Sequence, residues 1–337
     1  MVLYLSQHRA ELAGYGIDVP TYTSTVDRVI GELLADEALA QRREQWLRTE
    51  LEYDIGKSDL LRVHDPRYVE RLYSSAVIDE LIAAFELIDS EGRYHRYAPE
   101  RAELPLADLF LDLLGACAGT YQSSRVALEH GFCYFLGGGF HHAKWNTPDG
   151  FCLINDIVIA ARRLLSEELA SRVWIIDLDA HKGDGTAPLC RSDDRILTLS
   201  IHMAHGWPLD REPRLPDGSL HESFVASDLD IPVAEGEERL YLEKLQLGLA
   251  KFSGYGAPDL ALVLGGVDPY EHDELPSTAP LRLSLEQLEQ RDRFVYGFLK
   301  ERAIPQAWVK SGSYGREAWR PIVQFLRYAL HDRLGSR

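Results

Sequence analysis

The residues most capable of chemistry in this chain lie close together, directly after one apolar run. Residues 173–176 are all apolar, and Asp177, Asp179, His181 and Asp184 follow them. Because alternate side chains of an extended chain point to the same side, Asp177, Asp179 and His181 are expected to converge just beyond the strand. Carboxylate and imidazole groups placed in this way can bind a divalent metal ion. The alternative is a strand that runs into an ordinary capped turn, in which Asp and Gly are common.

Four further apolar runs end in the same way, in small or polar residues followed by a reactive side chain. The reactive side chains are His141 and His142 after residues 133–136, Ser200 after 196–199, Asp268 after 260–264, and Tyr314 after 307–309. Open α/β sheets bind ligands beyond the carboxyl ends of their strands. We therefore expect these side chains to gather at one edge of a sheet.

A metal-dependent hydrolase can be assembled from these groups. Two carboxylates and one imidazole would leave positions open on Zn²⁺ or Fe²⁺ for water and substrate. Adjacent histidines, each oriented by a carboxylate, would transfer protons, and a tyrosine in a glycine-flanked loop would stabilise an oxyanion. The common alternatives are missing from the sequence, since it contains no GxSxG, GxxxxGK[ST], GxGxxG or HExxH motif.

The elements that would position these groups form one domain over residues 1–337. Helical patterns are expected over residues 23–51, 106–130, 156–169, 239–252, 285–302 and 316–334. Asp65 and Pro66 mark the start of a further helix. Residues 1–22 and 89–104 are expected to be irregular. Strands that alternate with helices predict an α/β fold with a mostly parallel sheet.

Composition and charge narrow the class of protein. The 337 residues are 45% hydrophobic and 26% charged, with a formal net charge of −17. An acidic chain is unsuited to non-specific nucleic-acid binding but permits cationic substrates. The four cysteines form no CxxC pair, which suits a reducing compartment. Residues 1–16 lack the apolar core of a signal peptide and no apolar run is long enough to span a membrane, so a cytoplasmic protein is expected.

Four short motifs resemble those of the histone deacetylase family. They are Gly-Gly-Phe-His-His-Ala at 138–143, Gly-Phe-Cys at 150–152, Asn-Asp at 155–156 and Asp-Leu-Asp-Ala-His-Lys-Gly-Asp-Gly at 177–185. The resemblance extends from about His64 to the C-terminus, and the spacing after Ser200 is closer to class IV-like deacetylases. It implies the arginase–deacetylase fold, with an eight-stranded, mostly parallel sheet flanked by helices.

The resemblance also implies a role for each reactive residue. The catalytic metal, Zn²⁺ or Fe²⁺ in the cell, would be bound by Asp179, His181 and Asp268. His141, paired with Asp177, and His142, paired with Asp184, would transfer protons, with His142 as the base for the attacking water. Tyr314 would polarise the scissile carbonyl. The substrate would contact Gly150, Phe151 and Trp207. A structural K⁺ would be held by Asp177, Asp179, His181, Ser200 and Ile201.

The implied activity is hydrolysis of N-acyl-lysine, with water as the nucleophile. A small acylated amine such as an acetylpolyamine is an alternative substrate, and the sequence predicts no oligomeric state. An arginase-like ureohydrolase would need more carboxylate ligands, and a non-catalytic acyl-lysine reader would have lost a ligand, a tandem histidine or the tyrosine. Two residues depart from the family pattern: Lys182 stands where His or Gln is usual, and Ser313 where Gly is usual.

Overall fold

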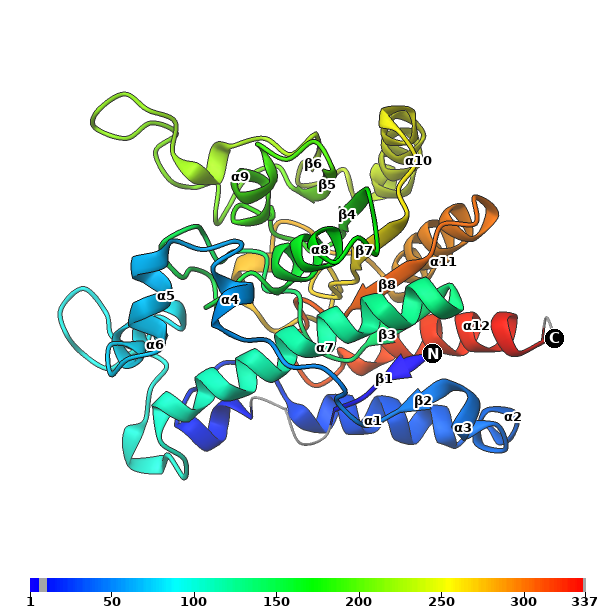
Figure 1. Cartoon of the computed structure of the whole chain (residues 1–337), viewed down its shortest axis with the longest axis horizontal. Helices are drawn as coiled ribbons and strands as arrows, with labels where there is room; N and C mark the ends of the chain where they lie inside the picture. Colours follow the sequence, from blue (N-terminus) through cyan, green and yellow to red (C-terminus); the bar gives the residue numbers. More distant parts are fainter. Residues whose placement is uncertain (6–10, 336–337) are drawn as a thin grey trace.

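The computed structural model describes residues 1–5 and 11–335 and is built around one parallel sheet (Figure 1). Its strands are β1 (Val2–Leu3), β2 (Leu47–Arg48), β3 (Phe132–Phe135), β4 (Val173–Asp177), β5 (Ile196–Met203), β6 (Leu229–Val233), β7 (Leu260–Leu264) and β8 (Gln306–Val309). The order across the sheet is β2-β1-β3-β8-β7-β4-β5-β6, and each neighbouring pair is parallel. The predicted α/β class and eight-stranded sheet are confirmed.

Both faces of the sheet are buried, which explains the continuous apolar runs of its central strands. In β4, Val173 and Ile175 belong to one hydrophobic core, whereas Trp174 and Ile176 belong to a second core on the opposite face. All four side chains are almost completely excluded from water. A strand covered on both sides therefore runs through the middle of the molecule and delivers Asp177 to its edge.

Helices form the two outer layers (Figure 1). They are α1 (Thr23–Leu34), α2 (Glu37–Ala40), α3 (Arg43–Trp46), α4 (Lys57–Leu60), α5 (Pro66–Leu72), α6 (Val77–Ala84), α7 (Leu109–His130), α8 (Asp156–Ser166), α9 (Thr186–Cys190), α10 (Tyr241–Phe252), α11 (Leu285–Glu301) and α12 (Trp319–Gly335). Helices α7 and α8 pack on each other over one face of the sheet, and α1, α11 and α12 pack together over the other.

Side-chain caps define where several of these helices begin. The Asp65 carboxylate accepts hydrogen bonds from the first turn of α5, as the sequence predicted. The Asn155 side chain accepts from the Val158 amide at the start of α8, over 3.1 Å. At α11, Ser284 and Gln287 cap each other reciprocally. Caps of this kind each stabilise a helix by about 1 kcal/mol, so they fix the loops that carry the site.

Three predictions about secondary structure were wrong. Residues 23–51 are not one helix, because the Asp36 side chain accepts from Ala38 and Leu39 and starts a new helix after α1. Residues 1–22 include β1, a two-residue strand too short to show a periodicity. Ser200 and Ile201 do not follow a strand but lie within β5, which extends to Met203.

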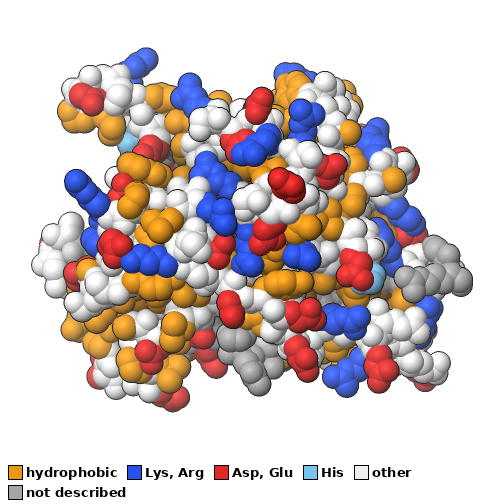
Figure 2. Space-filling view, viewed as in Figure 1, with side chains coloured by type: hydrophobic (Ala, Val, Ile, Leu, Met, Phe, Trp, Pro, Cys, Tyr) orange, Lys and Arg blue, Asp and Glu red, His pale blue; other side chains and the backbone are white. Residues whose placement is uncertain are grey.

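The surface carries charges of both signs. Lys and Arg side chains are interspersed with Asp and Glu side chains over the face shown in Figure 2. Among the described residues, the structure contains no helix that is both long and apolar enough to cross a membrane.

Candidate active site

The predicted site residues lie in loops that leave adjacent strands. Asp177 ends β4, and Asp268 lies in the loop after the neighbouring strand β7. Tyr314 follows β8, and His141 and His142 follow β3, the next strands in the sheet. Because all these strands are parallel, their carboxyl ends meet at one edge, where an open α/β sheet binds its ligands.

The loop that carries the tandem histidines is held by the first residue of α8. The buried carboxylate of Asp156 accepts hydrogen bonds from the backbone amides of Gly139, over 2.9 Å, and Phe140, over 2.6 Å. Gly139 has a φ of +93°, and a Cβ there would lie 2.5 Å from Cα of Ser311. Only glycine therefore lets the loop after β3 approach the loop after β8 this closely.

Asp179, His181 and Asp268 form a buried group whose ligand atoms all lie within 4.8 Å of one another. One oxygen of Asp179 accepts from the Gly312 amide over 2.9 Å and from the Ser311 hydroxyl over 3.0 Å. Oδ2 of Asp268 is buried without a hydrogen bond, although it lies 3.0 Å from Nδ1 of His181. Buried carboxylate oxygens are rarely left unpaired, so this oxygen fits a metal ligand.

The charges around this group also favour a cation. Burial opposes protonation of His181, but the neighbouring Asp179 and Asp268 carboxylates outweigh it and raise the pKa of His181 to about 10. Burial and the Asp179 charge raise the pKa of Asp268 to about 6. Two buried carboxylates thus attract positive charge at this point, and a divalent metal ion would satisfy them in place of a proton.

Each of the tandem histidines is hydrogen-bonded to a carboxylate through Nδ1. The distance is 2.7 Å from His141 to Asp177 and 2.7 Å from His142 to Asp184. Nε2 of His141 also lies 3.6 Å from Oδ1 of Asp179. The two imidazole rings are 3.9 Å apart between centroids. Nε2 is therefore the ring nitrogen of each histidine that is directed away from its main carboxylate partner.

Tyr314 and Phe151 enclose the space beside these groups, with ring centroids 6.1 Å apart. Burial and the Asp179 and Asp268 carboxylates hold the pKa of Tyr314 well above its ordinary value, so its hydroxyl stays a hydrogen-bond donor. The Tyr314 amide donates to the Asp273 carboxylate over 2.9 Å. This hydrogen bond ties the loop after β8 to the loop after β7.

Gly150 and Trp207 meet on the other side of His142. The Trp207 ring lies 4.4 Å from the His142 ring and 5.4 Å from the His181 ring, between centroids. Gly150 has a φ of +53°, and a Cβ there would lie 2.3 Å from the Trp207 ring and 2.7 Å from the His142 ring. A side chain at position 150 would consequently push the indole away from the histidine.

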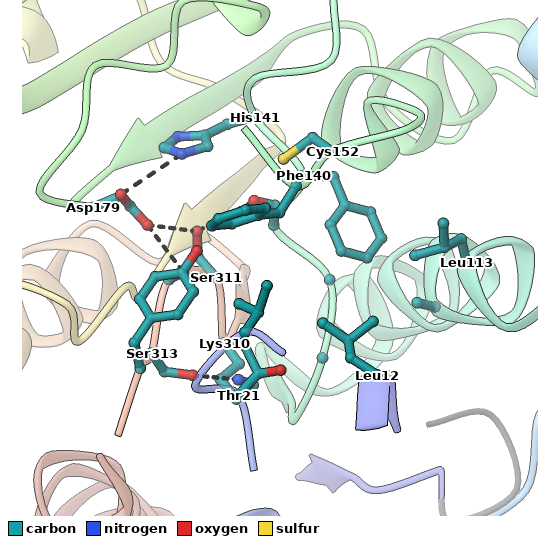
Figure 3. Close-up of a pocket in the computed structure, with 18 of the residues that line it drawn as sticks. Leu12, Thr21, Leu113, Phe140, His141, Cys152, Asp179, Lys310, Ser311 and Ser313 are labelled. Atoms are coloured by element: carbon teal, nitrogen blue, oxygen red, sulfur yellow. Dashed lines mark hydrogen bonds and ion pairs between the residues drawn. The ribbon is translucent and has the colours of Figure 1, made fainter. Parts of the chain in front are cut away.

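A cavity of about 190 Å³ lies beside these residues. His141, His142, Asp179, His181, Gly150 and Tyr314 form part of its wall, and it continues past them toward Leu12 and Leu113. Figure 3 shows His141 and Asp179 at one end of this cavity and Lys310 and Thr21 at the other. The cavity can therefore hold a ligand that reaches beyond the buried Asp–His–Asp group.

Several polar partners of the site were not anticipated from the sequence. Asp184 accepts from the Ser223 hydroxyl over 2.6 Å and lies 3.2 Å from the Lys144 ammonium. Lys144 also pairs with Asp149, which in turn pairs with Arg211 at 2.9 Å. The closeness of Lys144 to the tandem histidines in the sequence was an available signal. Ser223 and Arg211 are distant along the chain, so no local pattern indicated them.

The residues predicted to hold K⁺ lie on and just beyond two adjacent strands. Asp177 and Ser200 are paired in register between β4 and β5, and Ile201 follows Ser200 within β5. The Ser200 hydroxyl lies 3.1 Å from Nδ1 of His202. Asp179 and His181 follow Asp177 in the loop after β4.

Known proteins similar to this chain agree with its architecture. A model of the histone deacetylase domain matches residues 21–328. The chain is 31% identical to an uncharacterized protein of Picosynechococcus sp. over 258 residues, which cover 76% of this chain and 79% of that protein. It is 28% identical to histone deacetylase 2 of Arabidopsis thaliana over 329 residues, 96% of this chain and 76% of that protein.

A third relative is the acetoin utilization protein AcuC of Staphylococcus aureus. It is 30% identical over 282 residues, which cover 78% of this chain and 65% of AcuC. The family match spans most of the sheet and all of the loops described above. The parallel eight-stranded sheet is accordingly that of the arginase–deacetylase fold, and the chain belongs to the histone deacetylase family.

Proposed function

We propose that the protein is a metal-dependent amide hydrolase that removes an acetyl or other acyl group from N-acylated lysine. The observation that carries the proposal is the buried group of Asp179, His181 and Asp268 beside a cavity that two carboxylate-linked histidines also line. Membership of the histone deacetylase family supports a deacetylase. The reaction converts an acyl amide and water into a carboxylate and a free ammonium group.

The group Asp179, His181 and Asp268 would hold the catalytic metal. A bound Zn²⁺ or Fe²⁺ supplies Lewis acidity, which makes a water molecule more acidic and polarises the acyl carbonyl. His141 and His142 then divide the proton transfers between them. Burial and the positive His141 lower the pKa of His142 to about 4, so His142 is neutral at pH 7 and accepts the water's proton at Nε2.

His141 is the acid of the pair. Burial opposes its protonation, but the Asp177 and Asp179 carboxylates raise its pKa to about 9, so it carries a proton at pH 7. That proton passes from Nε2 of His141 to the leaving amine. The Tyr314 hydroxyl donates a hydrogen bond to the oxyanion of the tetrahedral intermediate. The Gly150 carbonyl accepts from the substrate amide, while Phe151 and Trp207 flank the lysine side chain.

A structural K⁺ is a further part of the proposal. It would be held by Asp177, Asp179, His181, Ser200 and Ile201, mostly through backbone oxygens. The register pairing of Asp177 with Ser200 supports this arrangement. Dialysis against Na⁺ in place of K⁺ should lower the melting temperature, and an unchanged melting temperature would remove K⁺ from the proposal.

The experiment that tests the function is acetate release from an acetyl-lysine peptide and from an acetylated polyamine, with Zn²⁺- and Fe²⁺-loaded protein. Release from the peptide supports the proposed substrate. Release from the polyamine alone would assign a small-molecule amidohydrolase. Asp268→Ala is expected to lose the metal and the activity together, while Asp259→Ala, a carboxylate bonded to backbone amides 171 and 172, should keep the metal.

A further inference from the structure

The cavity extends past the metal-binding group into an inner chamber with mainly apolar walls. Leu12, Val19, Phe85 and Leu113 line this chamber. The whole cavity measures about 190 Å³, whereas one water-sized group needs roughly 10–15 Å³ on the same measure. An acetyl group held at the metal-binding group would occupy only a small part of this space. The structure thus provides room for a longer acyl chain.

The ammonium of Lys310 contributes a positive charge to the wall of this cavity. Lys310 follows β8, and its Nζ donates a hydrogen bond to the Ser313 hydroxyl. An ammonium has three N–H donors, so two remain for other partners. Among residues 1–5 and 11–335, no Asp or Glu oxygen lies within 4.0 Å of Nζ. Lys310 and Thr21 both line the cavity, and Figure 3 draws them at the end of the view away from His141.

Lys310 is partly buried, whereas two buried lysines near the site, Lys144 and Lys182, are paired with acids. Lys144 lies 2.6 Å from Asp149, and Lys182 lies 2.9 Å from Asp230. Lys310 has no such partner within 4.0 Å among the described residues; burial lowers the pKa of its ammonium to about 8, and the more distant Asp273 carboxylate acts against that shift. An ammonium partly withdrawn from water without an adjacent counter-ion is costly. A ligand that brings a carboxylate into the chamber would remove this cost.

We propose that the inner chamber binds the terminal carboxylate of a dicarboxylic acyl group, with Lys310 as its ion-pair partner. The acyl carbonyl would lie at the group of Asp179, His181 and Asp268, the methylene chain along Leu12 and Leu113, and the terminal carboxylate at Nζ. This inference rests on the proposed function. The reaction then releases a free dicarboxylate and the lysine ammonium: water adds its hydroxyl to the carbonyl, the C–N bond breaks, and the amine gains the proton.

The first test compares acyl-lysine peptides whose acyl chains end in a carboxylate with peptides of equal length that end in a carboxamide. Succinyl, glutaryl and adipoyl chains place the terminal carboxylate at three different distances from the acyl carbonyl. In the parent enzyme, kcat/KM for the best carboxylate chain should exceed that of its carboxamide about tenfold or more, the scale of one charge-assisted hydrogen bond. Lys310→Met should abolish this ratio and Lys310→Arg should preserve it. An equal ratio in the parent and Lys310→Met would overturn the inference.

A binding measurement separates this inference from the proposed function. Glutarate and acetate are titrated into Zn²⁺-loaded parent, Lys310→Met and Lys310→Arg proteins by calorimetry. Glutarate should bind the parent and Lys310→Arg about tenfold or more tightly than Lys310→Met. An equal loss for acetate would assign Lys310 to a monocarboxylate product and overturn the inference. If no peptide is hydrolysed, the proposed function fails, and glutarate binding still decides the role of Lys310.

Discussion

His141 and His142 are neighbours with the same kind of partner, yet the protein tunes them in opposite directions. Each donates or accepts through Nδ1 at 2.7 Å from a carboxylate, Asp177 for the first and Asp184 for the second. Burial opposes protonation of both rings. The pKa of His141 is nevertheless raised to about 9, whereas that of His142 is lowered to about 4.

The difference lies in what surrounds each pair. His141 faces a second carboxylate, Asp179, at 3.6 Å. The charge of Asp184 is instead shared with Lys144 at 3.2 Å, and His142 has the positive His141 beside it. One hydrogen-bond distance therefore does not set the proton affinity of a buried histidine, because the net charge around the pair decides it. An acid and a base can then work side by side near pH 7.

The largest expected effect comes from removing His142, the proposed base. His142→Ala should lower kcat/KM for an acetyl-lysine peptide by about 10³-fold or more, near the upper part of the range for general base catalysis. His141→Ala should cost less, about 10²-fold, because the leaving amine can also take a proton from solvent. Both variants should keep their metal in elemental analysis. A greater loss in His141→Ala than in His142→Ala would make His141 the base and His142 the acid.

The second largest effect is expected from the Tyr314 hydroxyl, which belongs to neither histidine–carboxylate pair. Tyr314→Phe should lower kcat by about 10²- to 10³-fold, as for the loss of one oxyanion donor, without moving the pH at which either histidine titrates. Tyr241→Phe is the matched control, since the Tyr241 hydroxyl is buried without a hydrogen bond in the other hydrophobic core. A Tyr314→Phe enzyme as fast as the parent would remove the oxyanion role from Tyr314.

The sequence predicted much of this arrangement because strand ends are marked locally. An apolar run that ends in Asp177, or a pair of histidines after glycines, is visible without any tertiary information. The order of the strands then brings Asp179, His181 and Asp268 together. Their catalytic and metal-binding roles and the class IV-like assignment stay predictions.

Contacts between segments far apart in the chain could not be predicted from the sequence. The tuning of His142 depends on Ser223 and Lys144, which reach Asp184 from different loops. Lys310 has an ordinary position after a strand, and only the folded chamber shows that its ammonium lacks an acidic partner among the described residues. Strands β1 and β2 have two residues each, so their place in the sheet is set by neighbours and not by a pattern.

The contrast between His141 and His142 can be tested by removing the positive charge beside His142. In metal-free protein, His141→Gln should raise the pKa of His142 from about 4 toward its ordinary value, because His141 no longer repels its proton. Histidine NMR signals followed against pH would measure this shift. An unchanged pKa of His142 would mean that burial alone sets it.

The smallest effect is expected at Lys144. Lys144→Met removes the cation 3.2 Å from Asp184, so the Asp184 charge acts more fully on His142 and raises its pKa. The acidic limb of the pH–rate profile should therefore move to higher pH. The loss of kcat/KM at pH 7 should stay below about tenfold, which corresponds to roughly 1.4 kcal/mol. Arg211→Met is the control, because Arg211 pairs with Asp149 at 2.9 Å and has no contact with Asp184 among the described ion pairs. If both variants move the limb equally, the tuning belongs to the whole charged network and not to Lys144 itself.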